Sequence, residues 1–480
     1  MKTILKIFCI TAFLSFLFSC QKTSEFDDEL AGIDLKSASG CGEVFIVNPS
    51  GADDTQALKN AFEDAKASGP GAIVQLTEGT YNIGPIDVRD FNGCFIGAGK
   101  AKTYISNLPE LPCEELYQSD NLPYLMQFIG GNILISDLAF CINDGKPCAD
   151  SPTNAWIGDL LCTVLILGDF HAGYDMPEVR LIKGIVKNVD FIAGKINGGN
   201  NIYGLEGNVN MSLYCGPSYW NMTGTEPLSN GEITVTGCGF YQNNIGPDFA
   251  GFCKNSNIKV ENNIIEGCAY DMFMFANLGA KFSIKNNTFR GGQQYGLWIE
   301  DNDWGYYPNV VLQNRTEWNI TGNRFQGSPG YICLFLDDSR RTTHPEEGFP
   351  QLFNIKGNEF KTSDGGMAIQ GFNIFETKIW NNKFLGSGAV GVMINGDETT
   401  GTFAENNQII GNNYFGAKYT DASVYLGPYT KNCKVVGVSS DKVVDLGVNN
   451  SVIGTKANKK GNKSLHFTNR ELTNFKQKMK

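Results

Sequence analysis

The chain has 480 residues, of which 42% are hydrophobic and 19% charged, and it contains 56 glycines. This length allows a large core, and the composition is typical of strands and tight turns rather than of a helical protein. The net charge of −11 argues against nucleic acid as a partner, because binding to phosphates requires a clustered basic surface.

The first 20 residues are typical of a targeting segment. Lys2 and Lys6 precede an apolar run from Ile7 to Phe18 that is too short to span a bilayer as a folded element. The ending Leu17 to Cys20 resembles the lipobox of bacterial lipoproteins, which implies acylation of Cys20 and a lipid-anchored place at the outer membrane or cell surface. An ordinary secretory signal is the alternative. Residues 21–40 are polar and unpatterned, as in a tether.

A helix is predicted near the start of the main domain, residues 41–455. Asp53 or Asp54 can cap it, and Ser68 to Gly71 ends it. Its apolar face consists of Leu58, Ala61, Phe62 and Ala65. A strand run from Ala72 to Leu76 follows. Because the first coil of a stacked structure would expose unpaired N–H and C=O groups, we interpret this helix as a cap over that end.

The cysteines are compatible with an oxidising compartment. Without Cys9 and Cys20, 12 cysteines remain in the exported domain, an even number that permits disulfides. Cys141 and Cys148 flank a short loop and could bridge, whereas Cys238 and Cys333 are expected to be buried thiols. No spacing of Cys and His indicates a zinc site.

A short phrase recurs in the second half of the chain: an apolar residue, then Gly or Asn, then Asn, then an aromatic or apolar residue two places later. It ends at Ile265, Phe289, Phe325, Phe360, Phe384 and Tyr414, with spacings of 24, 36, 35, 24 and 30 residues. Such spacings match a supersecondary unit that buries its apolar side only by stacking on copies of itself. Apolar and polar residues alternate within each copy, which predicts an all-β solenoid of parallel strands.

Stacked copies should bring equivalent residues into vertical columns. The terminal aromatic residues are expected to point inward, about 4.8 Å apart. The preceding asparagines should lie at a bend that tolerates left-handed geometry and form a structural ladder; they are Asn263, Asn287, Asn323, Asn358, Asn382 and Asn412. Earlier coils end at Phe140, Phe191 and Phe240. Separations of 51 and 49 residues indicate either two coils each or one coil with a long excursion.

The sequence resembles a known superfamily at three places: the pattern GADDTxAxxxAxxxA from Gly51, the phrase FIGAG from Phe95 to Gly99, and the Asn-rich coils. These are similar to the pectate-lyase-like right-handed parallel β-helix superfamily, over roughly residues 41–455. The resemblance implies a right-handed parallel β-helix with an N-terminal capping helix. Lyases, hydrolases, epimerases, phage tailspikes and non-enzymatic adhesins share this fold, so it does not give the function.

Acidic residues cluster when the strands after each turn are aligned. Ala276, Glu300, Asp337, Gln370 and Asn395 share one column, and Asn277, Asp301, Asp338, Gly371 and Gly396 share the next. The four carboxylates would lie on two adjacent coils, the two that are lengthened to 36 and 35 residues. Stacked like charges repel unless a cation or an Arg intervenes, which suggests that the arrangement is used.

Three roles remain open for Glu300, Asp301, Asp337 and Asp338. They could bind Ca²⁺ through hard oxygen ligands that also bridge to the carboxylate of a uronic acid. A hydrolase pair is the second option, in which a carboxyl separation of roughly 6.5 to 9.5 Å would predict inversion. In the third, Arg340 and Arg341 neutralise Glu300 and Asp301 in a surface patch.

The insertions after these acids carry further candidates. Trp304, Tyr306 and Tyr307 offer flat faces to a pyranose ring, or simply cover the coil beneath. His344 could transfer a proton or be solvated. In this fold the resemblance implies an Arg or Lys base beside Ca²⁺-binding acids, a role open to Arg340 or Arg341. The Arg-x-Pro-x-x-Arg phrase of the lyases and the Gly-His-Gly and Arg-Ile-Lys phrases of polygalacturonases do not occur, so these residues are candidates by column position alone.

The sequence therefore predicts a lipid-anchored surface β-helix that acts on a polysaccharide, with a lyase on uronic-acid-containing glycans as the favoured activity. An inverting glycoside hydrolase and a non-catalytic glycan-binding or adhesive scaffold are the alternatives. The last residues, Lys456 to Lys480, form a basic segment, interpreted as a solvated tail, with a C-terminal cap as the other possibility.

Overall fold

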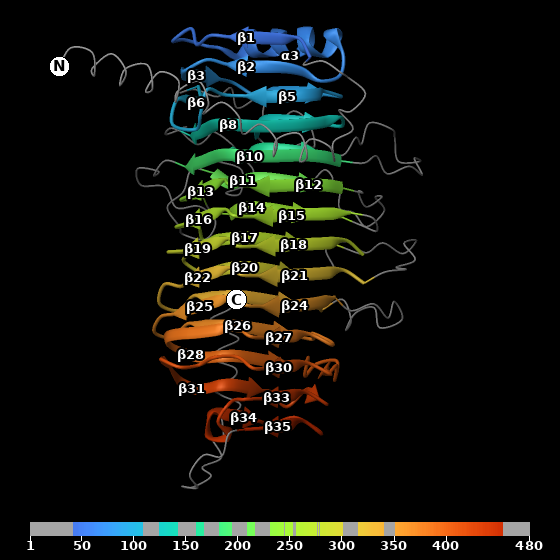
Figure 1. Cartoon of the computed structure of the whole chain (residues 1–480), viewed down its shortest axis with the longest axis vertical. Coiled ribbons are helices and arrows are strands. Elements are labelled where there is room, and N and C mark those ends of the chain that lie inside the picture. Colours follow the sequence, from blue (N-terminus) through green and yellow to red (C-terminus); the bar gives the residue numbers. More distant parts are fainter. Residues whose placement is uncertain are drawn as a thin grey trace, which may run out of the picture.

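A computed structural model describes residues 42–108, 124–142, 160–167, 182–193, 209–216, 231–243, 245–252, 256–275, 277, 279–300, 315–339 and 351–454. These residues form a right-handed parallel β-helix in which three strands make one coil, so that the strands stack in three columns (Figure 1). The predicted fold class is confirmed. Among the described residues, no helix is long and apolar enough to cross a membrane.

Column 1 begins next to the helix and runs the whole length of the solenoid. It consists of β1 (Val44–Val47), β2 (Ala72–Leu76), β5 (Asn92–Ile96), the first parts of β8 (Asn132–Ile142) and β10 (Ile182–Ala193), β12 (Gly231–Thr236), β15 (Asn257–Glu261), β18 (Lys281–Lys285), β21 (Glu317–Thr321), β24 (Leu352–Lys356), β27 (Lys378–Trp380), β30 (Gln408–Ile410), β33 (Lys434–Val436) and β35 (Ser451–Ile453).

Column 2 contains the strands that follow the asparagine bend. It consists of β3 (Gly79–Ile83), β6 (Thr103–Asn107), the second parts of β8 and β10, β13 (Gly239–Tyr241), β16 (Ile264–Glu266), β19 (Thr288–Arg290), β22 (Arg324–Gln326), β25 (Glu359–Thr362), and the first parts of β28 (Lys383–Asn395) and β31 (Ala417–Leu426).

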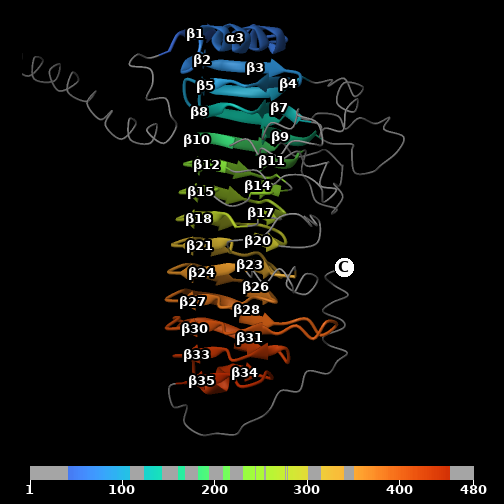
Figure 2. The ribbon, with the colours of Figure 1, turned by 90° about the vertical axis from the view of Figure 1, so that its right-hand side faces the viewer.

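Column 3 closes each coil and lies along one side of the molecule in Figure 2. It consists of β4 (Ile86–Arg89), β7 (Tyr124–Ile129), β9 (Leu160–Leu167), β11 (Val209–Gly216), β14 (Ile245–Ala250), β17 (Tyr270–Phe275), β20 (Tyr295–Glu300), β23 (Ile332–Asp337), β26 (Met367–Phe372), the second parts of β28 and β31, and β34 (Val443–Asp445). A short pair, β29 (Ala404–Glu405) with β32 (Thr430–Lys431), and the turn η5 (Ser440–Lys442) lie outside the columns.

The α-helix α3 (Thr55–Ser68) covers the first coils, as the sequence predicts. Its face of Leu58, Ala61, Phe62 and Ala65 is buried, and the Phe62 ring packs on the rings of Phe91, Phe95 and Phe128 with centroids 5.2 to 5.9 Å apart. Asp54 occupies the N-cap position, but its carboxylate accepts bonds from the N–H groups of Ser50 and Asn82, while Asp53 accepts from Thr55.

Each of the early phrases, which end at Phe140, Phe191 and Phe240, belongs to one coil. Phe140, Phe191 and Phe240 are direct partners in consecutive strands of column 2, which decides between the two alternatives in favour of single coils with long excursions. Their rings stack with centroids 5.3 and 5.0 Å apart.

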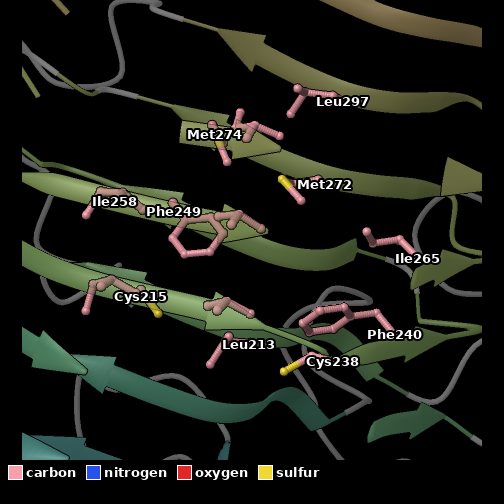
Figure 3. Close-up of a cluster of buried hydrophobic side chains, with 14 of the residues drawn as sticks. Leu213, Cys215, Cys238, Phe240, Phe249, Ile258, Ile265, Met272, Met274 and Leu297 are labelled. Carbon is pink, nitrogen blue, oxygen red and sulfur yellow. The ribbon is translucent and has the colours of Figure 1, made fainter. Parts of the chain in front are cut away.

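Inward-pointing side chains fill the space between the three columns (Figure 3). The stack predicted for column 2 continues from Phe289 through Phe325, Phe360 and Phe384 to Tyr414, with centroid separations of 4.5, 4.9, 5.3 and 4.5 Å. Ile265 interrupts it between Phe240 and Phe289. A parallel register therefore places each aromatic ring on the equivalent ring of the next coil. The rings bury most of their surface on the coils above and below.

The predicted asparagine ladder is present and buried. Each Oδ1 accepts the backbone N–H of the asparagine one coil earlier, at 2.8 to 3.0 Å, along Asn263, Asn287, Asn323, Asn358, Asn382 and Asn412. Cys238 holds the same place one coil before, and its N–H bonds to Asn263. The left-handed geometry lies one residue earlier than predicted, at Asn262, Gly322 and their equivalents, because the ladder side chains must point inward to reach the next coil.

The cysteines in the described part of the chain are thiols. Cys238 and Cys333 are buried, as predicted, and burial raises the pKa of Cys238 to about 12. Cys141, for which a bridge to Cys148 was considered, is a free half-buried thiol with a pKa raised by burial to about 11. Cys148 lies outside the described residues.

Candidate active site

The outer face of column 3 carries large apolar side chains. In β20, Leu297 and Ile299 belong to the interior core, whereas Trp298 lies in a separate cluster with Phe335 and Met393. β23 and β26 are buried on both faces except at their ends. Sequence alternation predicts only one buried face for such a strand, so this outer cluster was not predicted.

Two acids meet at the ends of neighbouring strands on this face. Glu300 is the last residue of β20, Asp337 is the last residue of β23, and the two are direct partners in the parallel register. Both are half-buried. Strand spacing places their backbones about 4.8 Å apart. The central pair of the predicted site is therefore brought together.

Two neighbours of this pair differ from the sequence alignment. The partner of Glu300 on the preceding coil is Phe275 rather than Ala276, and the partner of Asp337 on the next coil is Phe372 rather than Gln370. Asn395 keeps its predicted column, as the partner of Phe372. The two acids thus lie between phenylalanines, and this column offers them no other carboxylate on the flanking coils.

Asp338 has a different environment. Its side chain is fully buried, and its Oδ2 accepts the backbone N–H of Gln351 at 3.2 Å, while its own N–H donates to the carbonyl of Phe372. The first bond ties the end of β23 to the residue before β24, and the second ties it to the last residue of β26. Asp338 therefore has a structural role at this end of column 3.

Aromatic rings form a platform beside the two acids. Tyr270 and Tyr295 stack with centroids 5.6 Å apart, and Trp298 lies 4.6 Å from Tyr295 and 5.3 Å from Phe335. Burial and the nearby Glu300 carboxylate raise the pKa of Tyr295, so its hydroxyl stays protonated and able to donate. We call Tyr270, Tyr295, Trp298 and Phe335 the aromatic platform.

Buried polar side-chain atoms that lack a hydrogen-bond partner among the described residues lie on the same face. In register order, Trp298, Phe335 and Gln370 are successive partners. Among the described residues, the indole Nε1 of Trp298 and both amide atoms of Gln370, which is fully buried, have no hydrogen-bond partner. Buried donors and acceptors are normally satisfied. Gln370 lies between Phe335 and Met393 in the register.

Several predicted site residues lie outside the described part of the chain. They are Asp301, Trp304, Tyr306, Tyr307, Arg340, Arg341 and His344, together with the proposed lipid anchor Cys20. Within the ranges that the structure describes, no group of three or more His, Cys, Asp or Glu side chains could hold a metal ion. The Ca²⁺ site thus stays a prediction.

Two buried acids were not anticipated from the sequence. Asp271 lies in β17, and its carboxyl is hydrogen-bonded to the Tyr331 hydroxyl. Asp248 lies in β14, on the outer face beside Tyr214 and Phe273. Burial raises the pKa of both carboxyls well above the usual value. An acid inside an otherwise apolar strand is the one sequence signal that could have revealed them.

Comparison with known proteins gives only distant structural likeness. No family model and no curated protein matches the sequence. The A-module of mannuronan C-5 epimerase AlgE6 from Azotobacter vinelandii is similar in structure at 13% identity and a TM-score of 0.43, over 88% of this chain and 99% of that one.

Two further solved structures have comparable scores. The catalytic unit of a GH87 α-1,3-glucanase from Streptomyces thermodiastaticus strain HF3-3 has 13% identity and a TM-score of 0.43, over 88% of this chain and 67% of that one. DFA-IIIase from Arthrobacter chlorophenolicus A6 has 12% identity and a TM-score of 0.41, over 84% and 96%. The fold assignment rests on the strand pairing of this chain itself.

Proposed function

We propose that this protein acts on a polysaccharide at the outer face of column 3, as a lyase that cleaves uronic-acid-containing glycans by β-elimination. The observation that carries this proposal is the in-register pair Glu300 and Asp337, placed at the edge of the aromatic platform. Flat rings suit the C–H face of a pyranose, and the half-buried Tyr295 hydroxyl, which stays protonated, can donate a hydrogen bond to its hydroxyl groups.

The close backbone spacing of the pair suits a site in which the two carboxylates share one cation. Carboxyls of inverting hydrolases stand roughly 6.5 to 9.5 Å apart, which leaves room for a water molecule. Glu300 and Asp337 are neighbours in one column, so their backbones are only about 4.8 Å apart. Two acids this close repel each other unless a cation or an Arg intervenes.

A hard cation such as Ca²⁺ fits this pair. Glu300 and Asp337 would supply carboxylate oxygens, and a uronate carboxylate and waters would complete the six to eight ligands that Ca²⁺ takes. When bound, the ion would neutralise the substrate carboxylate and so favour loss of the neighbouring C5 proton. We assign the base to Arg340 or Arg341, which stand three and four residues after the end of β23 in the sequence. Asp338, fully buried and bonded to Gln351, is left with a structural role.

Substitution of the acidic pair tests this function. Glu300→Gln and Asp337→Asn are each expected to lower kcat/KM on a responsive acidic polysaccharide by about 100-fold or more, because each removes a charge that acts on the reacting centre. Activity is followed as new double bonds absorbing at 235 nm, with reducing ends measured in parallel. Glu317→Gln is the matched control, since Glu317 lies on column 1 and faces Lys281 at 3.9 Å.

Other outcomes of this experiment separate the alternatives. Reducing ends without new double bonds would indicate a hydrolase. Glycan binding that Trp298→Ala weakens roughly tenfold, with no product in either assay, would indicate a binding scaffold. Unchanged activity in both acid variants would place the active site elsewhere. Activity that is indifferent to a chelator would remove Ca²⁺ from the proposal but leave the pair in place.

We also propose that Cys20 anchors the mature protein to the membrane, since Leu17 to Cys20 is similar to a lipobox. Cells fed a labelled fatty acid are expected to label the wild-type chain and not Cys20→Ser, which should appear in the soluble fraction. Equal labelling or equal membrane association of the two chains would contradict the anchor. Cys94→Ser serves as a control for loss of an unrelated thiol.

A further inference from the structure

A buried hydrogen bond connects two coils at the corner between columns 2 and 3. The hydroxyl of Tyr331, which directly precedes β23, donates to the Asp271 carboxyl in β17. Both side chains are fully buried. Because β17 pairs with β20 and β20 pairs with β23, the bond bypasses the coil that lies between its two partners. We call Asp271 and Tyr331 the corner pair.

The coil in between is shaped to let the Tyr331 ring pass. A Cβ atom at Gly296, in β20, would lie 2.6 Å from the Tyr331 hydroxyl oxygen. One at Gly292 would lie 2.5 Å from the Tyr331 ring and 2.7 Å from the Asp271 carboxyl. Contacts this short leave no room for a side chain in a packed interior. Neither glycine has a left-handed φ, so both are needed for space and not for backbone conformation.

The three strands at this corner carry the aromatic platform and the acidic pair. In chain order, these residues are Tyr270, Tyr295, Trp298, Glu300, Phe335 and Asp337. Asp271 directly follows Tyr270, and Gly296 directly follows Tyr295. The corner pair and the glycine between its partners are therefore bonded along the chain to the strands that present the candidate site.

The apolar pattern of these strands determines their register only weakly. A slip of one residue exchanges the two faces of a strand. Both faces of β17 and β23 are largely buried, so such a slip would still bury apolar side chains. The turn into these strands also lengthens, since 12, 13 and 14 residues separate the ladder asparagine from Phe275, Glu300 and Asp337. A polar contact inside the corner removes this freedom, because a slip would separate the buried Asp271 carboxyl from the Tyr331 hydroxyl.

We propose that Asp271 and Tyr331 are positioning residues of the candidate active site, which fix the register of β17, β20 and β23 and so align the aromatic platform with Glu300 and Asp337. The inference rests on the proposed function. Tyr331 belongs to the interior core together with Cys333, and its bond to Asp271 lies inside the solenoid. Neither member of the corner pair touches the substrate, and both act through the strands.

Fluorine NMR tests the structural part of this proposal. In protein labelled with 5-fluorotryptophan, the Trp298 resonance, assigned through Trp298→Phe, reports the geometry of the platform. Tyr331→Phe and Asp271→Ala are each expected to shift this resonance and to speed amide exchange in β17, β20 and β23 by about tenfold or more, since each leaves a buried polar group without its partner. Asp271→Asn should restore both readouts towards wild type, because an amide oxygen still accepts the Tyr331 hydroxyl.

Tyr414→Phe is the matched control for loss of a tyrosine hydroxyl. The Tyr414 ring stacks on Phe384 and packs on the same core, and its hydroxyl has no hydrogen-bond partner among the described residues. Both readouts should therefore stay at their wild-type values. A Trp298 resonance and exchange rates that Tyr331→Phe and Asp271→Ala leave unchanged would overturn the proposal.

Turnover tests the functional part. On a responsive acidic polysaccharide, Tyr331→Phe and Asp271→Ala are expected to lower kcat/KM by about tenfold or more, because small displacements of positioned groups slow the reaction, and Asp271→Asn to recover most of this loss. Ile355→Val removes a buried methyl group from column 1, controls for lost stability and should keep the wild-type kcat/KM. An active wild type with equally active Tyr331→Phe and Asp271→Ala would overturn the positioning role alone. An inactive wild type would overturn the proposed function, and the positioning role with it.

Discussion

Asn323→Ala is expected to lower the free energy of unfolding by about 3 to 5 kcal/mol, a large fraction of the stability of most domains. The side-chain Oδ1 of Asn323 accepts from the backbone N–H of Asn287 at 2.8 Å and from its Nδ2 at 3.1 Å. Its Nδ2 donates to the carbonyl of Ile284 at 2.8 Å and to Asn358 Oδ1 at 3.0 Å. The substitution leaves several of these fully buried groups without a partner at once.

The control for this ladder substitution is Asn319→Ala. Asn319 lies on the same coil, is exposed, and accepts one bond from Asn354 at 3.2 Å, so we expect a change within about 0.5 kcal/mol. Urea unfolding measures both variants, and hydrogen exchange at residues 284–289 locates the damage, since solenoids open locally. Similar losses in the two variants would show that the ladder contributes no more than an exposed asparagine.

The ladder also explains why so much of the fold could be predicted. Asparagine and the aromatic residue recur together in each phrase, and both fix the register from inside the coil, as the Phe325 and Phe360 stack shows. The recurring asparagine and aromatic residue thus predicted the strands of columns 1 and 2, although nothing was known of the long loops between coils. The coils ending at Phe140 and Phe191 carry no ladder asparagine, and there the sequence left the number of coils open.

The site was harder to predict because the turn between columns 2 and 3 varies in length. From the ladder asparagine to the shared acid column there are 12 residues to Phe275, 13 to Glu300 and 14 to both Asp337 and Phe372. An alignment on the last apolar residue cannot detect such changes where the strand is apolar on both faces, as at β26. Hence Glu300 and Asp337 were placed correctly and Gln370 was not.

The aromatic platform was missed for the same physical reason. A strand with one buried face alternates in polarity, but β17 and β20 read as nearly continuous apolar runs, in which outward and inward residues cannot be told apart by composition. A continuous run in an otherwise alternating repeat was the available signal that the outer face of column 3 has a role beyond exposure to solvent.

The stability of the protein is expected to fall as pH rises above about 4, where aspartates of the unfolded chain ionise, and Asp248→Asn is expected to remove much of that fall. Burial raises the pKa of Asp248 well above the usual value, whereas in the unfolded chain an aspartate titrates near 3.9. Between these values the folded state binds the extra proton, so raising the pH favours unfolding, by up to about 1.4 kcal/mol per pH unit. The variant should gain on wild type with each rise in pH, up to the folded-state pKa of Asp248.

Asp271 provides an internal comparison for this pH dependence. The Tyr331 hydroxyl bonded to its carboxyl favours the ionised form and opposes the effect of burial on its pKa. Among the described residues, burial of Asp248 is opposed by a backbone hydrogen bond from Phe249 and by no side-chain donor, so Asp271→Asn should gain less than Asp248→Asn. Asp64→Asn, on the exposed face of α3, should leave the slope unchanged. Urea unfolding at three or four pH values measures all four proteins. Parallel slopes for wild type and Asp248→Asn would mean that this carboxyl ionises in the folded state as readily as in the unfolded one, and that its surroundings on the face of β14 are wet.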